Sequence, residues 1–249
     1  EEVVALVCPF ETIDGAVQAV IAAIQLGLGA ARIEFLDDHM MAAVNRYEKT
    51  AYAETPTLFV EFHGSPASVP GQAAAFEDFI GDFGGRVAER AALPEDRSAL
   101  WKARHNALYA ARALRPGARA VITDVCVPIS RLADCLLATR ADLDASALTA
   151  TVVGHVGDGN FHCLILVDPD DAAQVAEAEA LHQAMARRAI AMDGTCTGEH
   201  GVGLGKRDLL VEELGSAIPV MAAIKAALDP HDILNPGKIL GGQQRRRDP

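Results

Sequence analysis

The chain has 249 residues, of which 50% are hydrophobic, and a formal net charge of −12. This composition predicts a globular protein with a substantial core, built as one large domain or two small ones. The negative charge argues against a nucleic-acid-binding surface, which would be basic, and no apolar run reaches the roughly 18–20 residues of a membrane-spanning helix.

Hydrophobic periodicity predicts strands that alternate with helices along most of the chain. The predicted strands are residues 3–7, 31–36, 57–63, 87–91 and 120–128. The predicted helices are residues 16–26, 38–47, 70–83, 94–112, 129–143, 169–192 and 219–228. A β-hairpin is predicted over residues 150–167, no internal repeat is visible, and the tail 241–249 is expected to be disordered.

The hairpin decides the predicted fold class, because it requires antiparallel pairing inside an otherwise alternating pattern. We therefore predict an α+β fold rather than a doubly wound parallel sheet. In this fold a largely antiparallel sheet is covered by helices mainly on one face.

Two histidines flank the tight turn of this hairpin. Asp158-Gly159 is a strong signal for a two-residue type I′ turn, and that turn would place His155 directly opposite His162. Opposed residues point to the same face, with Cβ atoms about 4.5–5.5 Å apart, so the two imidazoles could chelate one metal ion. Taken alone, such a pair is more often half-buried packing than a metal site.

A glycine-rich loop over residues 194–206 supplies a third candidate ligand. The loop is not a Walker A motif, because His200 stands where that motif has glycine, and Lys206 stands where a dinucleotide fingerprint has its third glycine. Glu199 could complete a two-histidine, one-carboxylate site with open positions. His200 would then be free for proton transfer.

Five motifs carry a resemblance to a known family. HVGDGNFH (155–162), GEHGVG (198–203) and LNPGK (234–238) resemble the C-terminal signatures of FAD-linked 2-hydroxyacid dehydrogenases, of the vanillyl-alcohol-oxidase superfamily. WKARHNALY (101–109) and TDVCVPISRL (123–132) are most similar to its D-lactate dehydrogenase (cytochrome) branch. The resemblance implies a ferredoxin-like cap over residues 1–240, with the family's N-terminal FAD-binding domain absent from this chain.

The resemblance also implies roles for single residues in oxidising a 2-hydroxy acid. Arg104 fits the cation that holds the substrate carboxylate, although a surface ion pair is the alternative for this arginine. His200 fits the base. FAD, held mainly by the missing domain, would take the hydride, and Asn235 could contact its isoalloxazine ring.

A divalent metal, Zn or Mn, is the remaining expected cofactor. On His155, His162 and Glu199 it would act as a Lewis acid on the hydroxyl oxygen. Asp158 and Asn160 are expected to be structural residues of the turn.

The substrate is predicted from a departure at residue 122. Related D-2-hydroxyglutarate dehydrogenases carry a basic residue before the corresponding strand, where this chain has Ile122. This favours D-lactate or another small D-2-hydroxy acid, with D-2-hydroxyglutarate or glycolate as alternatives. Alternatives of another class are a His2Glu metallohydrolase and a non-catalytic metal-binding or dimerisation module.

The remaining expectations concern context. The chain begins with Glu1 rather than Met, so a fragment or processed chain without a signal peptide is expected, and it should be colourless and inactive by itself. The five scattered cysteines predict reduced thiols. An electron acceptor such as a cytochrome or quinone, a homodimer, and a location in the cytoplasm or peripheral to the inner membrane complete the prediction.

Overall fold

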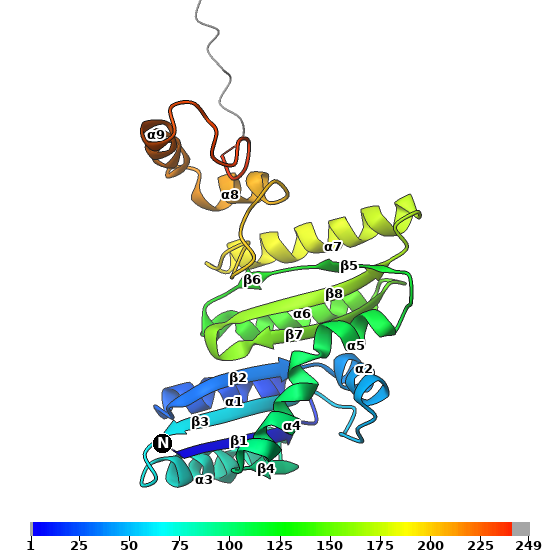
Figure 1. Ribbon diagram of the computed structural model, residues 1–249, viewed down its shortest axis with the longest axis vertical. Helices are drawn as coiled ribbons and strands as arrows, with labels where there is room; N and C mark the ends of the chain where they lie inside the picture. Colours follow the sequence, from blue (N-terminus) through cyan, green and yellow to red (C-terminus); the bar gives the residue numbers. More distant parts are fainter. Residues whose placement is uncertain (1, 241–249) are drawn as a thin grey trace, which may run out of the picture.

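Eight strands are present in the computed structural model, which describes residues 2–240. They are β1 (Glu2–Pro9), β2 (Ala30–Leu36), β3 (Thr57–Gly64), β4 (Glu89–Ala91), β5 (Arg119–Ile122), β6 (Val125–Cys126), β7 (Thr149–His155) and β8 (Asn160–Val167). They form one sheet in the order β4-β1-β3-β2-β7-β8-β5, and β6 also pairs with β8. Every strand pair in this sheet is antiparallel (Figure 1).

The same residues form nine α-helices. They are α1 (Ile13–Gln25), α2 (Asp38–Glu48), α3 (Val69–Ile80), α4 (Pro94–His105), α5 (Ala107–Ala113), α6 (Leu132–Asp144), α7 (Ala172–Ala191), α8 (Arg207–Leu214) and α9 (Ile218–Leu228). The predicted helix 94–112 is thus two helices that meet at Asn106, and α8 was not predicted. Side-chain caps begin several of them; for example, Asp37 accepts the backbone N–H of Met40 at 2.7 Å to begin α2.

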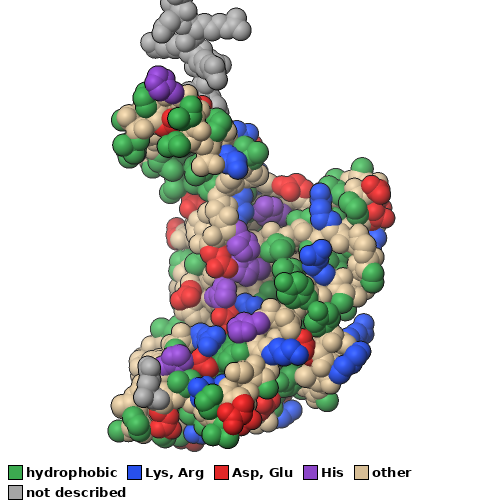
Figure 2. All heavy atoms as spheres, in the orientation of Figure 1, with side chains coloured by type: hydrophobic (Ala, Val, Ile, Leu, Met, Phe, Trp, Pro, Cys, Tyr) green, Lys and Arg blue, Asp and Glu red, His purple; other side chains and the backbone are tan. Residues whose placement is uncertain are grey.

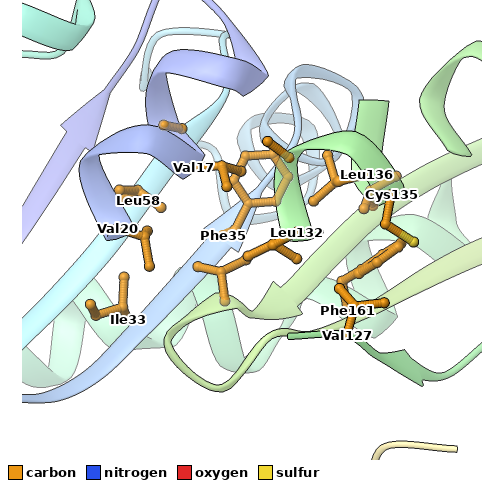
Figure 3. Packing of buried hydrophobic residues seen from close by; sticks show 14 of the residues in the cluster. Val17, Val20, Ile33, Phe35, Leu58, Val127, Leu132, Cys135, Leu136 and Phe161 are labelled. Carbon is orange, nitrogen blue, oxygen red and sulfur yellow. The ribbon is translucent and has the colours of Figure 1, made fainter. Parts of the chain in front are cut away.

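Both faces of the sheet carry helices. On one face α1, α3, α6 and α7 enclose the larger apolar core, in which Val17 of α1 and Leu132 of α6 pack near Phe35 of β2 (Figure 3). On the other face α2, α4 and α5 cover a smaller core, which includes Val153 of β7 and Leu164 of β8. The predicted α+β class with a largely antiparallel sheet is confirmed, and this second layer is an addition to it.

The sheet is built from two halves with the same order of elements. Apart from α2, which is inserted between β2 and β3, the first half (β1 to β4) runs β1-α1-β2-β3-α3-β4, with strand order β4-β1-β3-β2. The second half (β5 to β8) runs β-α-β-β-α through α6 and α7, with order β7-β8-β5. The halves join where Phe35 pairs with Gly154 and Leu36 with Val153. This ferredoxin-like repeat is one of topology, which is why no repeat of residues is visible in the sequence.

The predicted hairpin exists, but the predicted two-residue turn is wrong. His155 pairs with Asn160, and His162 pairs with Val153, so the loop has four residues and includes the 3₁₀ turn η3 (Val156–Asp158). Gly159 ends that turn at φ 78°, and a Cβ there would lie 2.1 Å from the carbonyl oxygen of Val127. The register differs from the prediction by two residues, and because side chains alternate with period two, both histidines still face the same side.

The C-terminal arm, α8 and α9 with the chain up to residue 240, extends away from the sheet (Figure 1). None of the residues of α9 is buried, and its apolar side chains Val220, Ile224 and Leu228 are each more than half exposed. Among residues 2–240, no helix is both long enough and apolar enough to cross a membrane. The prediction of a disordered tail at 241–249 lies outside the described residues.

Candidate functional site

The two histidines of the hairpin point at the same carboxylate. His155 ends β7 and His162 lies in β8, with ring centroids 5.7 Å apart and ring planes at 84°. The distances to Glu199 Oε1 are 3.4 Å from Nε2 of His155 and 3.1 Å from Nε2 of His162. One ligand atom from each of these residues lies within 4.8 Å of the others. The structure therefore brings the three predicted metal ligands together.

The inner nitrogens of both rings face hydrogen-bond acceptors. Nδ1 of His155 lies 2.7 Å from Glu34 Oε1, and Nδ1 of His162 lies 3.1 Å from the carbonyl oxygen of Thr123. The hydrogen bond with Glu34 raises the pKa of His155, although burial opposes it. Burial lowers the pKa of His162, which is only 6% exposed. At neutral pH His162 is therefore the more readily neutral imidazole of the two.

Asp124 holds the loop that carries Glu199 and His200. This residue is fully buried between β5 and β6, and its Oδ2 accepts the backbone N–H groups of Glu199 at 3.0 Å and His200 at 2.8 Å. The same oxygen accepts the hydroxyl of Thr197 at 3.0 Å. Burial raises the pKa of Asp124, but the hydrogen bonds from His200, Asn160 and Glu199 and the charge of Lys206 outweigh it, so the pKa stays below its usual range.

Two further residues complete the support beneath this loop. Asn160 donates from Nδ2 to Asp124 Oδ1 at 2.9 Å and to the Val125 carbonyl at 2.8 Å, in agreement with a structural role. A Cβ at Gly198 would lie 2.0 Å from that Nδ2, so the close approach of the loop requires glycine. Lys206, 7% exposed, donates from Nζ to the carbonyl oxygen of Asp124 at 3.0 Å.

His200 stacks on His162 at the rim of the site. Their ring centroids are 4.7 Å apart with planes at 17°, and His200 Nε2 lies 3.7 Å from Glu199 Oε1. Asp124, His162 and His200 also offer ligand atoms close enough to share an ion. The oxygens of Asp124 are already occupied by donors, however, so His155, His162 and Glu199 are the better set.

Arg104 reaches the site from α4 and forms an ion pair inside it. Its Nε and Nη2 each lie 2.9 Å from Glu34 Oε2, and its side chain is 16% exposed. The sequence analysis gave a surface ion pair as the alternative to substrate binding for Arg104. An ion pair is present, but it lies within the site and not on an open surface. Burial raises the pKa of Glu34, while the hydrogen bond from His155 and the charge of Arg104 outweigh this and lower it overall.

A hollow of about 240 Å³ joins these groups. Its lining residues are Arg104, Ala107, Leu108, Ile122, Val153, His155, His162, Leu164, Glu199 and His200. Figure 2 shows histidine side chains gathered along this face of the molecule. The lining thus combines apolar side chains with three imidazoles, a carboxylate and a guanidinium.

Asn235, the predicted flavin contact, lies elsewhere. It is exposed in the C-terminal arm, has a left-handed φ of 49°, and does not line the hollow. Glu34 and Asp124, by contrast, were missed by the sequence analysis. Both are acids inside predicted strands, Glu34 between the apolar residues Ile33 and Phe35, and an acid at such a position is the signal that could have found them.

Comparison with known proteins gives close relatives. A protein named Probable D-lactate dehydrogenase, mitochondrial, from Danio rerio is 54% identical over 241 residues, which cover 96% of this chain and 48% of that protein. D-lactate dehydrogenase (cytochrome), mitochondrial, from Arabidopsis thaliana is 44% identical over 238 residues, covering 95% and 42%. The chain therefore spans about half the length of the relatives it matches.

Solved structures share the fold. The 4-ethylphenol oxidase of Gulosibacter chungangensis superposes with a TM-score of 0.75 at 18% identity, over 99% of this chain and 55% of that one. The p-cresol methylhydroxylase gives 0.71 at 15% identity, over 96% and 53%. A family model described as FAD linked oxidases, C-terminal domain, matches residues 1–239. Together with the close relatives, this match shows that the chain belongs to the family of FAD linked oxidases, as their C-terminal domain.

Proposed function

We propose that this chain is the substrate- and metal-binding half of an FAD-dependent D-2-hydroxyacid dehydrogenase that oxidises D-lactate to pyruvate. One observation carries the proposal: the Nε2 atoms of His155 and His162 converge on the carboxylate of Glu199 in the hollow that Arg104 and His200 also line. The family and the names of the relatives support the reaction class.

The donor set fits a divalent metal. Two imidazole nitrogens and one carboxylate oxygen suit Zn or Mn and leave positions open for a substrate. His155, His162 and Glu199 would hold the ion, which would polarise the substrate hydroxyl. This chemistry needs the proton of that hydroxyl to leave, and a base must therefore lie beside the metal ligands.

His200 and Arg104 supply the remaining protein groups. His200 can accept the hydroxyl proton at Nε2, which lies 3.7 Å from Glu199 Oε1 at the rim of the hollow. Arg104 can pair with the substrate carboxylate through its guanidinium fork, since a second carboxylate can share a guanidinium already paired with Glu34. FAD, when bound by the other half of the protein, supplies the hydride acceptor.

The apolar lining of the hollow supports a substrate with a single carboxylate. Ile122 is 40% exposed in the lining, with Leu108 and Leu164 beside it. A second substrate carboxylate against this lining would lose its hydration without gaining a partner. This supports a monocarboxylate such as D-lactate over D-2-hydroxyglutarate. Family membership argues against the hydrolase and non-catalytic alternatives, which would not need a flavin.

The C-terminal arm supports the assignment of residues 1–240 as one half of a larger protein. An apolar helix such as α9 with no buried residue needs a partner surface, and the relatives are about twice as long as this chain. We infer that the arm, including Asn235, packs on the flavin-binding half. A homodimer stays a prediction.

The proposed location differs from the first expectation. The names of both relatives place them in mitochondria, so we propose a mitochondrial protein in place of a cytoplasmic one. One relative is named for a cytochrome acceptor, and we propose that a cytochrome re-oxidises the flavin here as well.

Anaerobic flavin reduction tests the proposal. The full-length protein, mixed with D-lactate, should lose its flavin absorption, and removal of metal by a chelator should slow this reaction until Mn²⁺ is restored. Reduction that is indifferent to the chelator would contradict the metal's role. Reduction by D-2-hydroxyglutarate in preference to D-lactate would contradict the substrate.

A further inference from the structure

Glu34 is shared between two groups of the site. Its Oε1 lies 2.7 Å from Nδ1 of His155, and its Oε2 accepts Nε of Arg104 at 2.9 Å and lies 2.9 Å from Nη2 of the same guanidinium. Resting on the proposed function, we propose that Glu34 is a positioning residue that selects the metal-binding tautomer of His155 and holds Arg104 at the hollow. Only 8% of Glu34 is exposed, so water competes little for these bonds.

The selection follows from the kinds of atoms that meet. An ionised carboxylate only accepts hydrogen bonds, so the hydrogen between Glu34 and His155 must sit on Nδ1. The lone pair of His155 is then on Nε2, which faces Glu199 at 3.4 Å. The opposite tautomer would direct an N–H at the same place and could not ligate a metal. Carboxylate partners of this kind commonly orient metal-binding histidines.

The strand register explains why Glu34 is at this place. Phe35 pairs with Gly154 at the junction of β2 and β7, so Glu34 stands opposite His155 when the same register is continued by one residue. Arg104 comes from α4, which packs on β1 and β4 of the first half. The first half thus supplies the carboxylate, the helix α4 packed on it supplies the arginine, and the second half supplies the histidines.

The first half also contains a matched control. Glu61 Oε1 accepts Nε and Nη2 of Arg32 at 2.9 and 2.6 Å and lies 2.7 Å from Nε2 of His63. Glu61 is 2% exposed, and it therefore resembles Glu34 in burial and in partners. Within residues 2–240, His63 belongs to no group of side chains that could hold a metal.

The test compares Glu34→Gln with Glu34→Ala in the full-length flavoprotein, titrated with Mn²⁺ after chelation. Arg104 offers only donors, so the oxygen of the new glutamine must face it, and the NH₂ group must face His155. This imposes the wrong tautomer. We expect the Kd for Mn²⁺ to rise about 100-fold in the Gln variant and about 10-fold in the Ala variant, the range for lost outer partners of a metal ligand.

A purely structural role for Glu34 predicts the opposite order, because glutamine has nearly the same shape as glutamate and alanine leaves a void. The KM for D-lactate at saturating Mn²⁺ should rise more in the Ala variant than in the Gln variant, because glutamine can keep its bond to Arg104 and alanine cannot. Nitrogen NMR of the metal-free protein, recorded at an alkaline pH where the imidazole of His155 is neutral, should report hydrogen on Nδ1 of His155 in the wild type and on Nε2 in the Gln variant. Glu61→Gln should leave the Kd for Mn²⁺ within about twofold.

The outcomes distinguish a wrong role for Glu34 from a wrong metal site. If Glu34→Gln binds Mn²⁺ as tightly as the wild type, or more tightly than Glu34→Ala, the tautomer role is wrong. If His155→Ala and His162→Ala lose Mn²⁺ in the same assay, the proposed metal site still stands. If those two variants keep the metal, the proposed function itself is at fault.

Discussion

Two clusters of arginine, glutamate and histidine lie on the same face of the sheet. The first-half triad is Arg32, Glu61 and His63. The site triad is Arg104, Glu34 and His155. Each contains a buried carboxylate that a guanidinium fork and an imidazole approach within 2.9 Å. They differ in what lies beyond the triad.

In the first-half triad, an aromatic side chain occupies the second oxygen of the carboxylate. Trp101 donates from Nε1 to Glu61 Oε2 at 2.6 Å, and its ring lies 4.0 Å from the guanidinium carbon of Arg32. In the site triad the outer nitrogen of the histidine faces Glu199, beside His162. An Arg–Glu–His triad around a buried carboxylate is therefore no indication of chemistry by itself. The second imidazole and the glycine-rich loop distinguish the site.

The largest effect that this comparison predicts is at His200. In the full-length enzyme, His200→Ala should lower kcat about 10²–10⁴-fold, because a positioned base is lost while the metal and the carboxylate clamp remain. His63→Ala, in the first-half triad, should stay within a few-fold of wild type. Steady-state kinetics with D-lactate measure both, and an active His200→Ala variant would remove His200 from the role of base.

The next largest effect is on metal content, which should depend on the histidines of the site and not on that of the first-half triad. His155→Ala or His162→Ala should abolish stoichiometric divalent metal in the full-length protein, since two protein ligands cannot retain an ion that three hold. His63→Ala should keep it. Elemental analysis after gel filtration checks this, and full metal content in both site variants would show that the ion lies elsewhere.

Asp124→Asn tests whether the loop distinguishes the site. An amide nitrogen at Oδ2 would face the backbone N–H groups of Glu199 and His200, so buried donors lose their acceptor at a cost of about 1–3 kcal/mol. We expect lower stability in urea unfolding together with weaker Mn²⁺ binding. Glu61→Gln should also lose stability but bind Mn²⁺ normally. Equal Mn²⁺ affinity in the two variants would mean that the loop does not need Asp124.

A smaller effect is expected at the apolar lining. Ile122→Lys would place a cation beside the hollow, and it should raise kcat/KM for D-2-hydroxyglutarate relative to D-lactate by several-fold. A wild-type enzyme that already prefers D-2-hydroxyglutarate would overturn the interpretation of Ile122.

The smallest effect concerns acid stability of the first-half triad. Burial raises the pKa of Glu61, but hydrogen bonds from His63, Arg32 and Trp101 outweigh it, so the folded-state pKa lies below the ordinary 4.5. The stabilisation from Glu61 is therefore present above pH 4.5 and is lost as the pH falls through the lowered value. Unfolding free energies measured from pH 6 to 3 should fall less steeply for Glu61→Gln. Parallel curves would show that Glu61 does not titrate with folding.

Much of the site was predictable from local sequence. The alternation of apolar residues predicted the strands, and the hairpin signal placed both histidines on one face even though its register was wrong by two residues, because side-chain direction repeats every two residues. The glycine-rich loop indicated close backbone approach, which Gly198 shows against Asn160. The same loop supplied Glu199 and His200 as candidates, and the family motifs implied their roles in oxidising a 2-hydroxy acid.

Other features depended on the tertiary structure. The loop of the hairpin is set by the approach of Gly159 to the Val127 carbonyl, a contact between separate segments. Glu34 meets His155 only because β2 pairs with β7, and Asp124 holds residues 199 and 200 across a gap of more than seventy positions. A sequence determines which groups a strand presents on each face, since that periodicity is local. Which strands become neighbours is decided by the packing of the whole chain, and the shared carboxylate of Glu34 exists only once that packing is complete.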